Sequence, residues 1–187
     1  MVIKMNYVEL NRTLYHGSNM SFSAINLSKS APKKDFGQGF YTTTDKFQAE
    51  KFARLKAKRA KASKGYVEIF TLNSIDDLIV KRFDAANEEW FDFILCNRGY
   101  SKFATNTIND VFDIVIGPVA NDAVGLVLNQ FVVGVYGEPT STEPKATAIR
   151  LLLTQKLHNQ VFFGTESAVS RLSFAGVYDV CFDRASY

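Results

Sequence analysis

Two short stretches decide the fold: LYHGSNMSF at residues 14–22 and DFGQGFYTTT at residues 35–44. In the first, His16 and Gly17 follow apolar residues that predict a strand. In the second, the aromatic and β-branched residues of GFYTTT predict another strand. Because glycine has no Cβ, Gly17 leaves the backbone beside the His16 ring accessible to a ligand. The two stretches are therefore candidates for one binding site.

The composition predicts a single domain over residues 1–187. Hydrophobic residues make up 47% of the chain and aromatic residues 13%, which is enough for one full core. The net charge of +3 is too small to indicate a nucleic-acid-binding protein by itself. The first twelve residues contain no secretory signal pattern, and no apolar run is long enough to cross a bilayer. We expect a cytoplasmic protein without a membrane-spanning segment.

The cysteine and histidine patterns do not predict a metal site. Cys96 and Cys181 are far apart and lack the spacing of metal ligands, so we expect reduced thiols in the core. The second histidine, His158, is expected at the end of a helix, where a cation is favourable.

Strand and helix patterns alternate without the regular order of a doubly wound sheet, which favours an α+β fold. The predicted strands cover residues 13–16, 39–44, 66–72, 111–119, 160–164 and 173–182. The predicted helices cover residues 46–64, 85–98, a segment beginning near 121, 144–157 and 165–172. The segment 137–144 has the composition of a surface loop.

The predicted helix over residues 46–64 is strongly basic. Asp45 precedes it as an N-cap and Gly65 is expected to end it. Its lysines and arginines alternate with alanines, as on a solvated helix face, and we expect Phe47 and Phe52 to lie in the core. An RNA-binding role would need exposed aromatic rings beside the lysines, so a nucleic-acid partner is disfavoured.

The two glycines of FGQGF, residues 36–40, do not form a phosphate-binding fingerprint. The third glycine of GxGxxG and the Gly-Lys-Ser ending are both missing, and the segment leads into a strand rather than a helix. A dinucleotide-binding Rossmann unit and a P-loop are therefore rejected.

In order along the chain, LYHGSNMSFSAI and FGQGFYTTTDKFQAEKFA resemble the first two active-site segments of ADP-ribosyltransferases of the diphtheria-toxin and poly(ADP-ribose) polymerase type. Through WFDFILCNR, DIVIGPVAND and NQVFFGTESAVSRLSF, the chain also resembles a bacterial family of uncharacterised function grouped with that superfamily. The resemblance implies a split, two-sheet α+β fold with surrounding helices. It implies no metal.

The resemblance also implies that NAD is the co-substrate. His16 and Tyr41 match the first two members of the superfamily's His-Tyr-Glu triad. His16 would hydrogen-bond the adenine-side ribose, and Tyr41 would stack on the nicotinamide ring. Gly17 would bind the nicotinamide carboxamide through its main chain, supported by Ser18. By the same resemblance, the NAD site has two halves, one at His16 and Gly17 and the other in GQGFY, to which Gly39 belongs.

The sequence departs from the superfamily at the third member of the triad. Where a glutamate is expected to open a strand, this chain has Gln160, which carries no charge to stabilise an oxocarbenium-like ribose. Opposite charges about 4 Å apart at an effective dielectric near 20 attract by roughly 4 kcal/mol, on the order of a thousandfold in rate. Glu166 is either a replacement carboxylate or, as we favour, an acidic residue in a helix's first turn.

Three functions are open at this level. The first is a mono-ADP-ribosyltransferase that modifies a macromolecular acceptor; by resemblance, it could be the toxin of a toxin–antitoxin pair with a small neutralising protein as partner. The second is a non-catalytic module on the same fold that binds NAD, ADP-ribose or a partner protein. The third, an RNA-associated protein, ranks last. Gln160 disfavours polymerisation of ADP-ribose, because elongation in the related polymerases relies on the missing glutamate.

Overall fold

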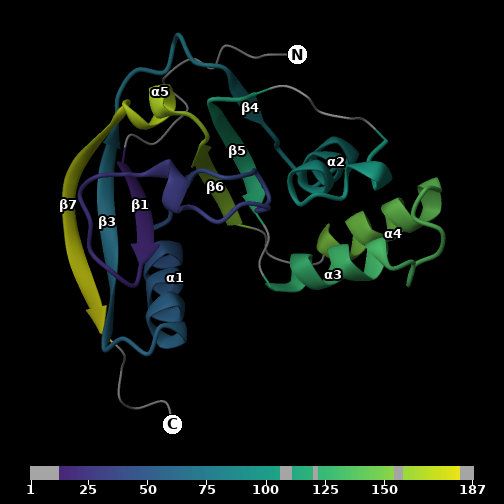
Figure 1. Ribbon diagram of the computed structural model, residues 1–187, viewed down its shortest axis with the longest axis horizontal. Coiled ribbons are helices and arrows are strands. Elements are labelled where there is room, and N and C mark those ends of the chain that lie inside the picture. The colour runs from purple at the N-terminus through teal and green to yellow at the C-terminus, as the bar shows by residue number, and fades with distance from the viewer. Residues whose placement is uncertain (1–12, 106–110, 120–121, 154–157, 182–187) are drawn as a thin grey trace.

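The computed structural model describes residues 13–105, 111–119, 122–153 and 158–181. Within these ranges the chain forms two open sheets and five α-helices (Figure 1). Sheet A has three strands in the order β1-β3-β7, and sheet B has four in the order β2-β6-β5-β4. The predicted α+β class with two sheets is confirmed.

Both sheets are mostly antiparallel. Sheet A consists of β1 (Thr13–Ser18), β3 (Lys64–Leu72) and β7 (Leu172–Cys181). Sheet B consists of β2 (Phe40–Thr42), β4 (Val80–Arg82), β5 (Ile114–Val119) and β6 (His158–Phe163). Only the β4–β5 pair within these sheets is parallel among the strands described.

Three of the described helices begin after an N-cap residue whose side-chain oxygen accepts main-chain hydrogen bonds. Asp45, Asn87 and Thr165 each accept hydrogen bonds from main-chain N–H groups in the first turn that follows. The α-helices are α1 (Lys46–Arg59), α2 (Glu88–Asn97), α3 (Asp122–Val132), α4 (Thr142–Leu153) and α5 (Glu166–Val169). Short 3₁₀ turns lie at η2 (Leu27–Lys29) and η3 (Ser101–Phe103). In the described ranges, no helix is both long and apolar enough to span a bilayer.

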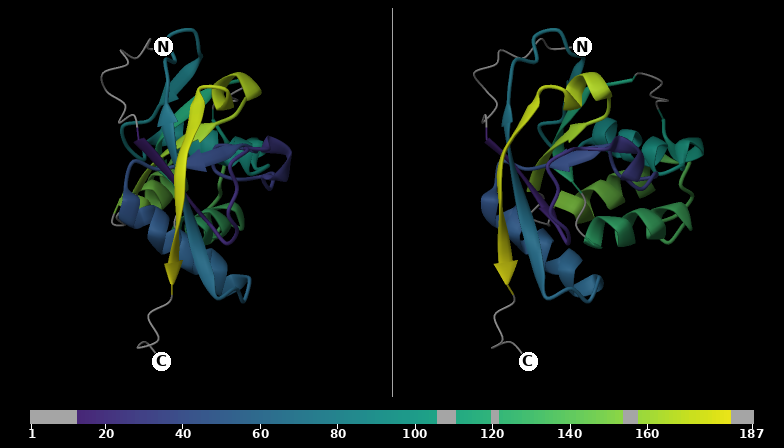
Figure 2. Two further views of the ribbon diagram at one scale, coloured as in Figure 1. Left: turned by 90° about the vertical axis from the view of Figure 1, so that its left-hand side faces the viewer. Right: turned by 60° about the vertical axis from the view of Figure 1, so that its left-hand side comes forward.

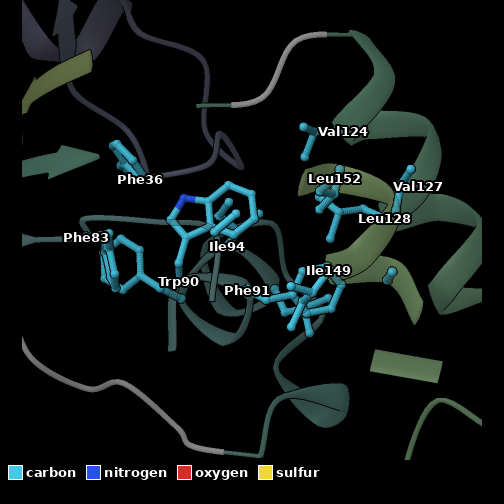
Figure 3. Packing of buried hydrophobic residues seen from close by; sticks show 14 of the residues in the cluster. Phe36, Phe83, Trp90, Phe91, Ile94, Val124, Val127, Leu128, Ile149 and Leu152 are labelled. Atoms are coloured by element: carbon cyan, nitrogen blue, oxygen red, sulfur yellow. The ribbon is translucent and has the colours of Figure 1, made fainter. Parts of the chain in front are cut away.

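The alternation of side chains along the strands creates separate apolar layers. Leu14 of β1 and Phe163 of β6 belong to one cluster, which fills the space between the sheets. Phe162, next to Phe163, belongs instead to the cluster that sheet B shares with α2, α3 and α4. Figure 3 shows the aromatic and aliphatic side chains of that second cluster, with Trp90 and Phe91 of α2 at its centre.

Helix α1 covers the other face of sheet A. Its alanines Ala49 and Ala53 pack with Val67 of β3 and Val180 of β7. Figure 1 and the right-hand view of Figure 2 show α1 along the lower half of this sheet, on the side away from the helices α2, α3 and α4. Small side chains let the helix lie directly on the sheet.

The sheets are joined in the described chain by a single isolated bridge between β1 and the residue after β2. The Tyr15 N–H donates to the Thr43 carbonyl at 2.8 Å, and the Thr43 N–H donates back to the Tyr15 carbonyl at 2.9 Å. This bridge brings the two stretches that open the sequence analysis side by side.

Several local expectations are wrong. Helix α1 ends at Arg59 rather than near residue 64, and Gly65 lies within β3, where its hydrogens face the Ala53 backbone. The loop predicted over 137–144 gives way to α4 at Thr142, because Pro144 is tolerated in a helix's first turn. His158 begins strand β6 and does not end a helix.

Two further expectations about burial are wrong. Phe47 is 79% exposed and Phe52 is 42% exposed, because only the alanine stripe of α1 faces the sheet. This exposure removes the reason for ranking an RNA-binding role last. Both cysteines are free of disulfides, but neither is fully buried in the core: Cys96 is half-buried and Cys181 is exposed at the end of β7.

Replacing Gly17 by alanine tests the close contact between β1 and α1. A Cβ at this position would lie 2.8 Å from the Ala53 nitrogen and closer still to the Ala49 carbonyl oxygen. We expect Gly17→Ala to lower the free energy of unfolding by about 1–3 kcal/mol, measured by urea denaturation. Gly125→Ala is the matched control: its Cβ would meet only the Arg98 side chain at 3.9 Å, and the helix propensity of alanine predicts equal or higher stability. Equal stability of the two variants would contradict the close contact.

Candidate functional site

His16 lies on the face of β1 that looks into the space between the sheets, on the same side as Leu14. Its Nδ1–H donates a hydrogen bond to the Tyr41 carbonyl oxygen at 2.6 Å. The ring stacks on Phe40, with centroids 4.6 Å apart, and meets the edge of Phe22 at 5.5 Å. This hydrogen bond fixes the tautomer and leaves Nε2 as an acceptor, with no hydrogen bond to another described residue.

The main chain of Gly17 lies on a free edge of sheet A. Tyr15 uses its N–H and C=O for the bridge to Thr43, on the side of β1 away from β3. In an antiparallel strand the polar groups of alternate residues point to the same side, so those of Gly17 point off the edge as well. No described residue hydrogen-bonds to them. One donor and one acceptor beside His16 therefore have no described partner, although Gly17 itself is buried.

The segment 35–39 is held in place by Tyr41. The Tyr41 hydroxyl donates to the Gly37 carbonyl at 2.8 Å and accepts from the Phe36 N–H at 3.1 Å. Asp35 forms an ion pair with Arg98 at the end of α2. Gly37 has a φ of +96°, which glycine adopts readily. Tyr41 therefore has a structural role, because its hydroxyl group holds the segment 35–39 in place.

Tyr41 reaches His16 through its carbonyl oxygen and not through its ring. The ring packs on Phe162, with centroids 4.9 Å apart, and carries the Lys34 ammonium 5.0 Å from its centroid. It belongs to the layer that faces the helices, whereas the His16 ring stacks on Phe40 in the layer between the sheets.

Gln160 and Glu166 lie apart from His16. Gln160 is the third residue of β6, pairs with Gly117, and shares its face of sheet B with Phe162. Strand β2 separates β6 from β1, so among the described contacts none joins the side chains of His16, Tyr41 and Gln160.

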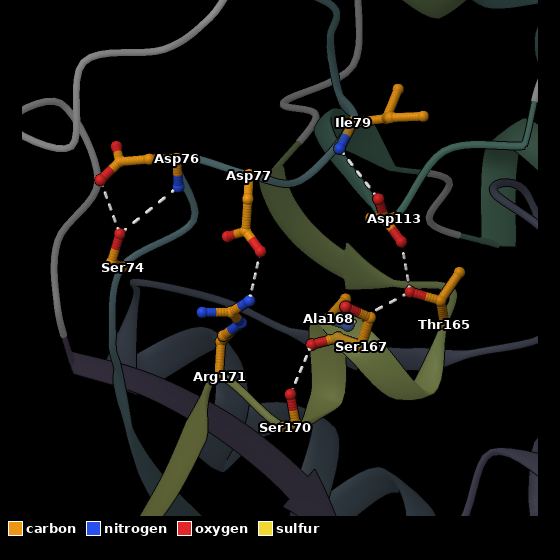
Figure 4. Close-up of polar contacts among 10 residues, drawn as sticks. All are labelled: Ser74, Asp76, Asp77, Ile79, Asp113, Thr165, Ser167, Ala168, Ser170 and Arg171. Carbon is orange, nitrogen blue, oxygen red and sulfur yellow. Dashed lines mark hydrogen bonds and ion pairs between the residues drawn. The ribbon is translucent and has the colours of Figure 1, made fainter.

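Glu166 is exposed and begins helix α5, beyond the end of β6. That turn is anchored by other side chains (Figure 4): Asp113 accepts hydrogen bonds from the Thr165 hydroxyl at 2.5 Å and from the Ile79 N–H at 2.9 Å. On the same end of the molecule, Arg171 pairs with Asp77. The position of Glu166 fits an acidic residue in a helix's first turn.

Ser18 and Gly39 have local structural roles. Ser18 is buried, and its hydroxyl accepts a hydrogen bond from the Met20 N–H at 3.3 Å. A Cβ on Gly39 would collide with the Phe162 ring and lie 2.5 Å from the Phe163 carbonyl oxygen. Gly39 therefore lets the chain pass close to β6 before β2 begins.

Two lysines place positive charge near His16. Burial, followed by the charge of Lys56, lowers the pKa of His16 to about 3, and Lys34 acts in the same direction; the hydrogen bond to the Tyr41 carbonyl opposes the shift. Burial also lowers the pKa of both lysines. The charge of Lys34 lowers the pKa of Lys56 further, whereas Asp35 opposes the shift of Lys34 and Glu68 opposes that of Lys56. His16 is therefore neutral at physiological pH, beside a cationic flank.

Glu68 is a residue of this site that sequence reasoning missed. It lies on β3 directly opposite His16 and has no exposed surface, and neither carboxyl oxygen has a hydrogen-bond partner in the structure. Burial raises the pKa of Glu68 from 4.5 to about 7, and nearby main-chain N–H groups of Glu68 and Phe22 and the Lys56 charge oppose the shift. The one available signal was a glutamate inside the apolar strand YVEIFTL.

No group of three histidine, cysteine, aspartate or glutamate side chains that could hold a metal ion occurs in the described ranges. The site's chemistry consists of a neutral imidazole, a buried carboxyl group, two lysines and an unpaired, buried strand edge.

The comparisons with known proteins give a family. The family described as "Protein of unknown function (DUF3990)" matches residues 12–174. The chain belongs to this family. No curated protein and no solved structure shows a significant match to it. The matched range includes His16, Tyr41, Glu68, Gln160 and Glu166.

The buried Glu68 predicts a pH-dependent stability difference. In the native state this carboxyl group binds its proton up to about pH 7, whereas in the unfolded chain it releases the proton near pH 4.5. The contribution of Glu68 to stability is therefore complete below pH 4.5 and is lost as the pH rises to 7. Relative to wild type, Glu68→Gln should gain up to about 3 kcal/mol between pH 4.5 and 8, since glutamine does not ionise.

Thermal melting of both proteins at pH 5 and pH 8 measures this difference. The lowered pKa of His16 makes the protein less stable as the pH falls below 6.5, which is opposite to the effect of Glu68. Because His16 is present in both proteins, its effect cancels in the comparison. Glu50→Gln, on the far side of sheet A where Glu50 accepts from Tyr178, is the matched control and should follow wild type. A melting-temperature difference between Glu68→Gln and wild type that is the same at both pH values would refute the assignment.

Proposed function

We propose that this protein binds NAD and transfers its ADP-ribose group to a macromolecular acceptor, on a split ADP-ribosyltransferase fold. The observation that carries the proposal is the unpaired main-chain N–H and C=O of Gly17, which lie buried beside the anchored ring of His16. The motif resemblance assigned NAD binding to these two residues.

The Gly17 edge has the right chemistry for a carboxamide. Nicotinamide's carboxamide carries two N–H donors and one carbonyl acceptor, and the C=O and N–H of a strand residue complement one of these donors and the acceptor. The bridge at Tyr15 and Thr43 ends the pairing just before Gly17, so the ligand amide would continue a sheet-like pattern.

The electrostatics of the site support a ligand with phosphate groups. Lys34 and Lys56 come from different elements, the loop before β2 and helix α1, and both act on His16. The pyrophosphate of NAD would relieve the mutual repulsion of two such partly buried ammonium groups. We assign these lysines to the phosphates and the neutral His16 to the adenine-side ribose.

Tyr41 and Gln160 have less direct roles in this proposal. Tyr41 positions His16 through its carbonyl oxygen and orders the 35–39 segment through its hydroxyl. Gln160 can hydrogen-bond a ribose hydroxyl but gives no charge to an oxocarbenium-like transition state. The expected activity is slow transfer of single ADP-ribose units.

A second candidate is a non-catalytic module that binds NAD, ADP-ribose or a partner protein. The neutral Gln160 favours it, because binding needs only hydrogen bonds, whereas rapid transfer gains from a carboxylate. Either function is compatible with a neutralising partner protein.

Calorimetric titration with NAD and a nicotinamide-release assay on the same sample test both candidates. Wild type should bind NAD, and His16→Ala should weaken binding at least tenfold, since it removes the ribose contact. Tyr41→Ala should weaken binding through the loss of order in residues 35–39, whereas Tyr41→Phe should lose less because the ring stays packed on Phe162. Gln160→Glu should raise nicotinamide release, and Glu166→Ala should leave it unchanged.

The outcomes separate the candidates. Nicotinamide release that depends on His16 establishes a transferase or NAD hydrolase. NAD binding without release establishes the binding module. A wild-type protein that does not bind NAD contradicts both.

A further inference from the structure

Glu68 is the polar group in the described chain whose burial is hardest to explain by the fold. Its side chain has no exposed surface, and neither carboxyl oxygen has a partner at good hydrogen-bond geometry, although the main-chain N–H groups of Glu68 and Phe22 lie nearby. The other fully buried carboxylate, Asp92, pairs with Lys145 at 2.5 Å. A buried polar group without a partner is destabilising, so its presence calls for an explanation, and a ligand that supplies the missing hydrogen bonds is one.

The strand register places Glu68 next to His16. Because the polar main-chain groups of Tyr15 point away from β3, those of His16 point toward β3 and form a hydrogen-bonded pair with Glu68. Side chains of such a pair stand on the same face, with Cβ atoms about 5 Å apart. His16 Nε2 and the two Glu68 oxygens therefore form one group of acceptors.

The side chains around this group indicate its ligand. Lys56 of α1 acts electrostatically on both His16 and Glu68, and Lys34 acts on His16 and Lys56. Adjacent acceptors for hydroxyl groups and a pair of ammonium groups for phosphates match a nucleoside diphosphate: the ribose provides two neighbouring O–H donors, and the diphosphate provides the negative charge.

The covering segment, residues 19–25, lies over the pair without strong attachment. Phe22 meets the His16 ring edge-on, and its main chain lies near Glu68. Apart from the hydrogen bond from the Met20 N–H to Ser18 and the approach of the Phe22 N–H to the Glu68 carboxyl group, no main-chain hydrogen bond to a described residue holds this segment, and Phe22 and Ile25 attach it through apolar packing. Met20 is 60% exposed. Few bonds therefore oppose displacement of the segment by a ligand.

We propose that Glu68 is a ligand-binding residue of this site, whose carboxylate accepts hydrogen bonds from the 2′ and 3′ hydroxyls of the adenine-side ribose held against His16. The assignment rests on the proposed NAD site and adds a residue from β3 to it. Glu68 would give the site a carboxylate on β3, whereas the superfamily's glutamate is expected at the position of Gln160 on β6.

Binding of ADP and of 2′,3′-dideoxy-ADP to the full chain tests the assignment. Wild type should bind ADP about tenfold or more tightly than the dideoxy analogue. In Glu68→Gln this preference should largely disappear, because the loss falls on ADP alone. Glu50→Gln, on the opposite side of sheet A, should keep the wild-type preference. Glu68→Gln preserves the side-chain shape, so its folding, checked by circular dichroism, is expected to be intact.

A pH series gives a second readout. The ionised carboxylate is the better acceptor, so the wild-type preference for ADP should grow between pH 6 and pH 8 and stay flat in Glu68→Gln. The titratable groups near Glu68 are the neutral His16 of β1 and the cationic Lys56 of α1; Lys34 acts on both of these, and all three residues are kept in this variant.

Each result decides one of the proposals. Equal weakening of ADP and dideoxy-ADP in Glu68→Gln shows a purely structural role and overturns the assignment. An unchanged preference for ADP, or NAD binding by wild type without ADP binding, also overturns it while leaving the NAD site intact. A wild type that binds none of the three ligands overturns both proposals.

Discussion

The bridge between Tyr15 and Thr43 is the constraint on which the rest of the structure depends. It joins two sheets whose strands otherwise pair only within their own sheet in the described ranges. One residue later, the His16 ring bonds the Tyr41 carbonyl and continues the junction through a side chain. The apolar cluster between the sheets, from Leu14 to Phe163, stabilises this junction by burial, since two hydrogen bonds alone would contribute little net free energy.

The end of this bridge also creates the site. Because pairing stops at Tyr15, the main-chain groups of Gly17 have no described partner, and because His16 shares the inter-sheet face with Leu14, its ring lies at the margin of the core. Burial there keeps His16 neutral and raises the pKa of Glu68 toward neutrality, whereas the nearby lysines bring positive charge. The strand register therefore sets the electrostatics of the site, because it decides which groups lose contact with water.

Much of the fold could be predicted from local pattern. The strands of sheet A, the Asp45 cap and the aromatic helix α2 follow from residue type and period. The errors occur where tertiary contacts override the pattern: Phe52 follows the helical period of the alanines but lies outside the stripe that faces the sheet. Of the candidate site, the Tyr41 carbonyl meets His16, whereas the Tyr41 ring that the motif assigns to the nicotinamide packs in the layer facing the helices, and Gln160 lies on another strand behind β2.

The sequence by itself determined the alternation of apolar and polar residues, the helix caps and the glycines at close contacts, because these depend on near neighbours in the chain. Only the tertiary structure decided which faces meet. Glu68 is 52 residues from His16, and nothing in YVEIFTL indicates its partner; the antiparallel register of β1 and β3 makes them neighbours. Burial by the second sheet and the covering segment then gives an ordinary glutamate its unusual pKa, since desolvation is a property of the assembled fold.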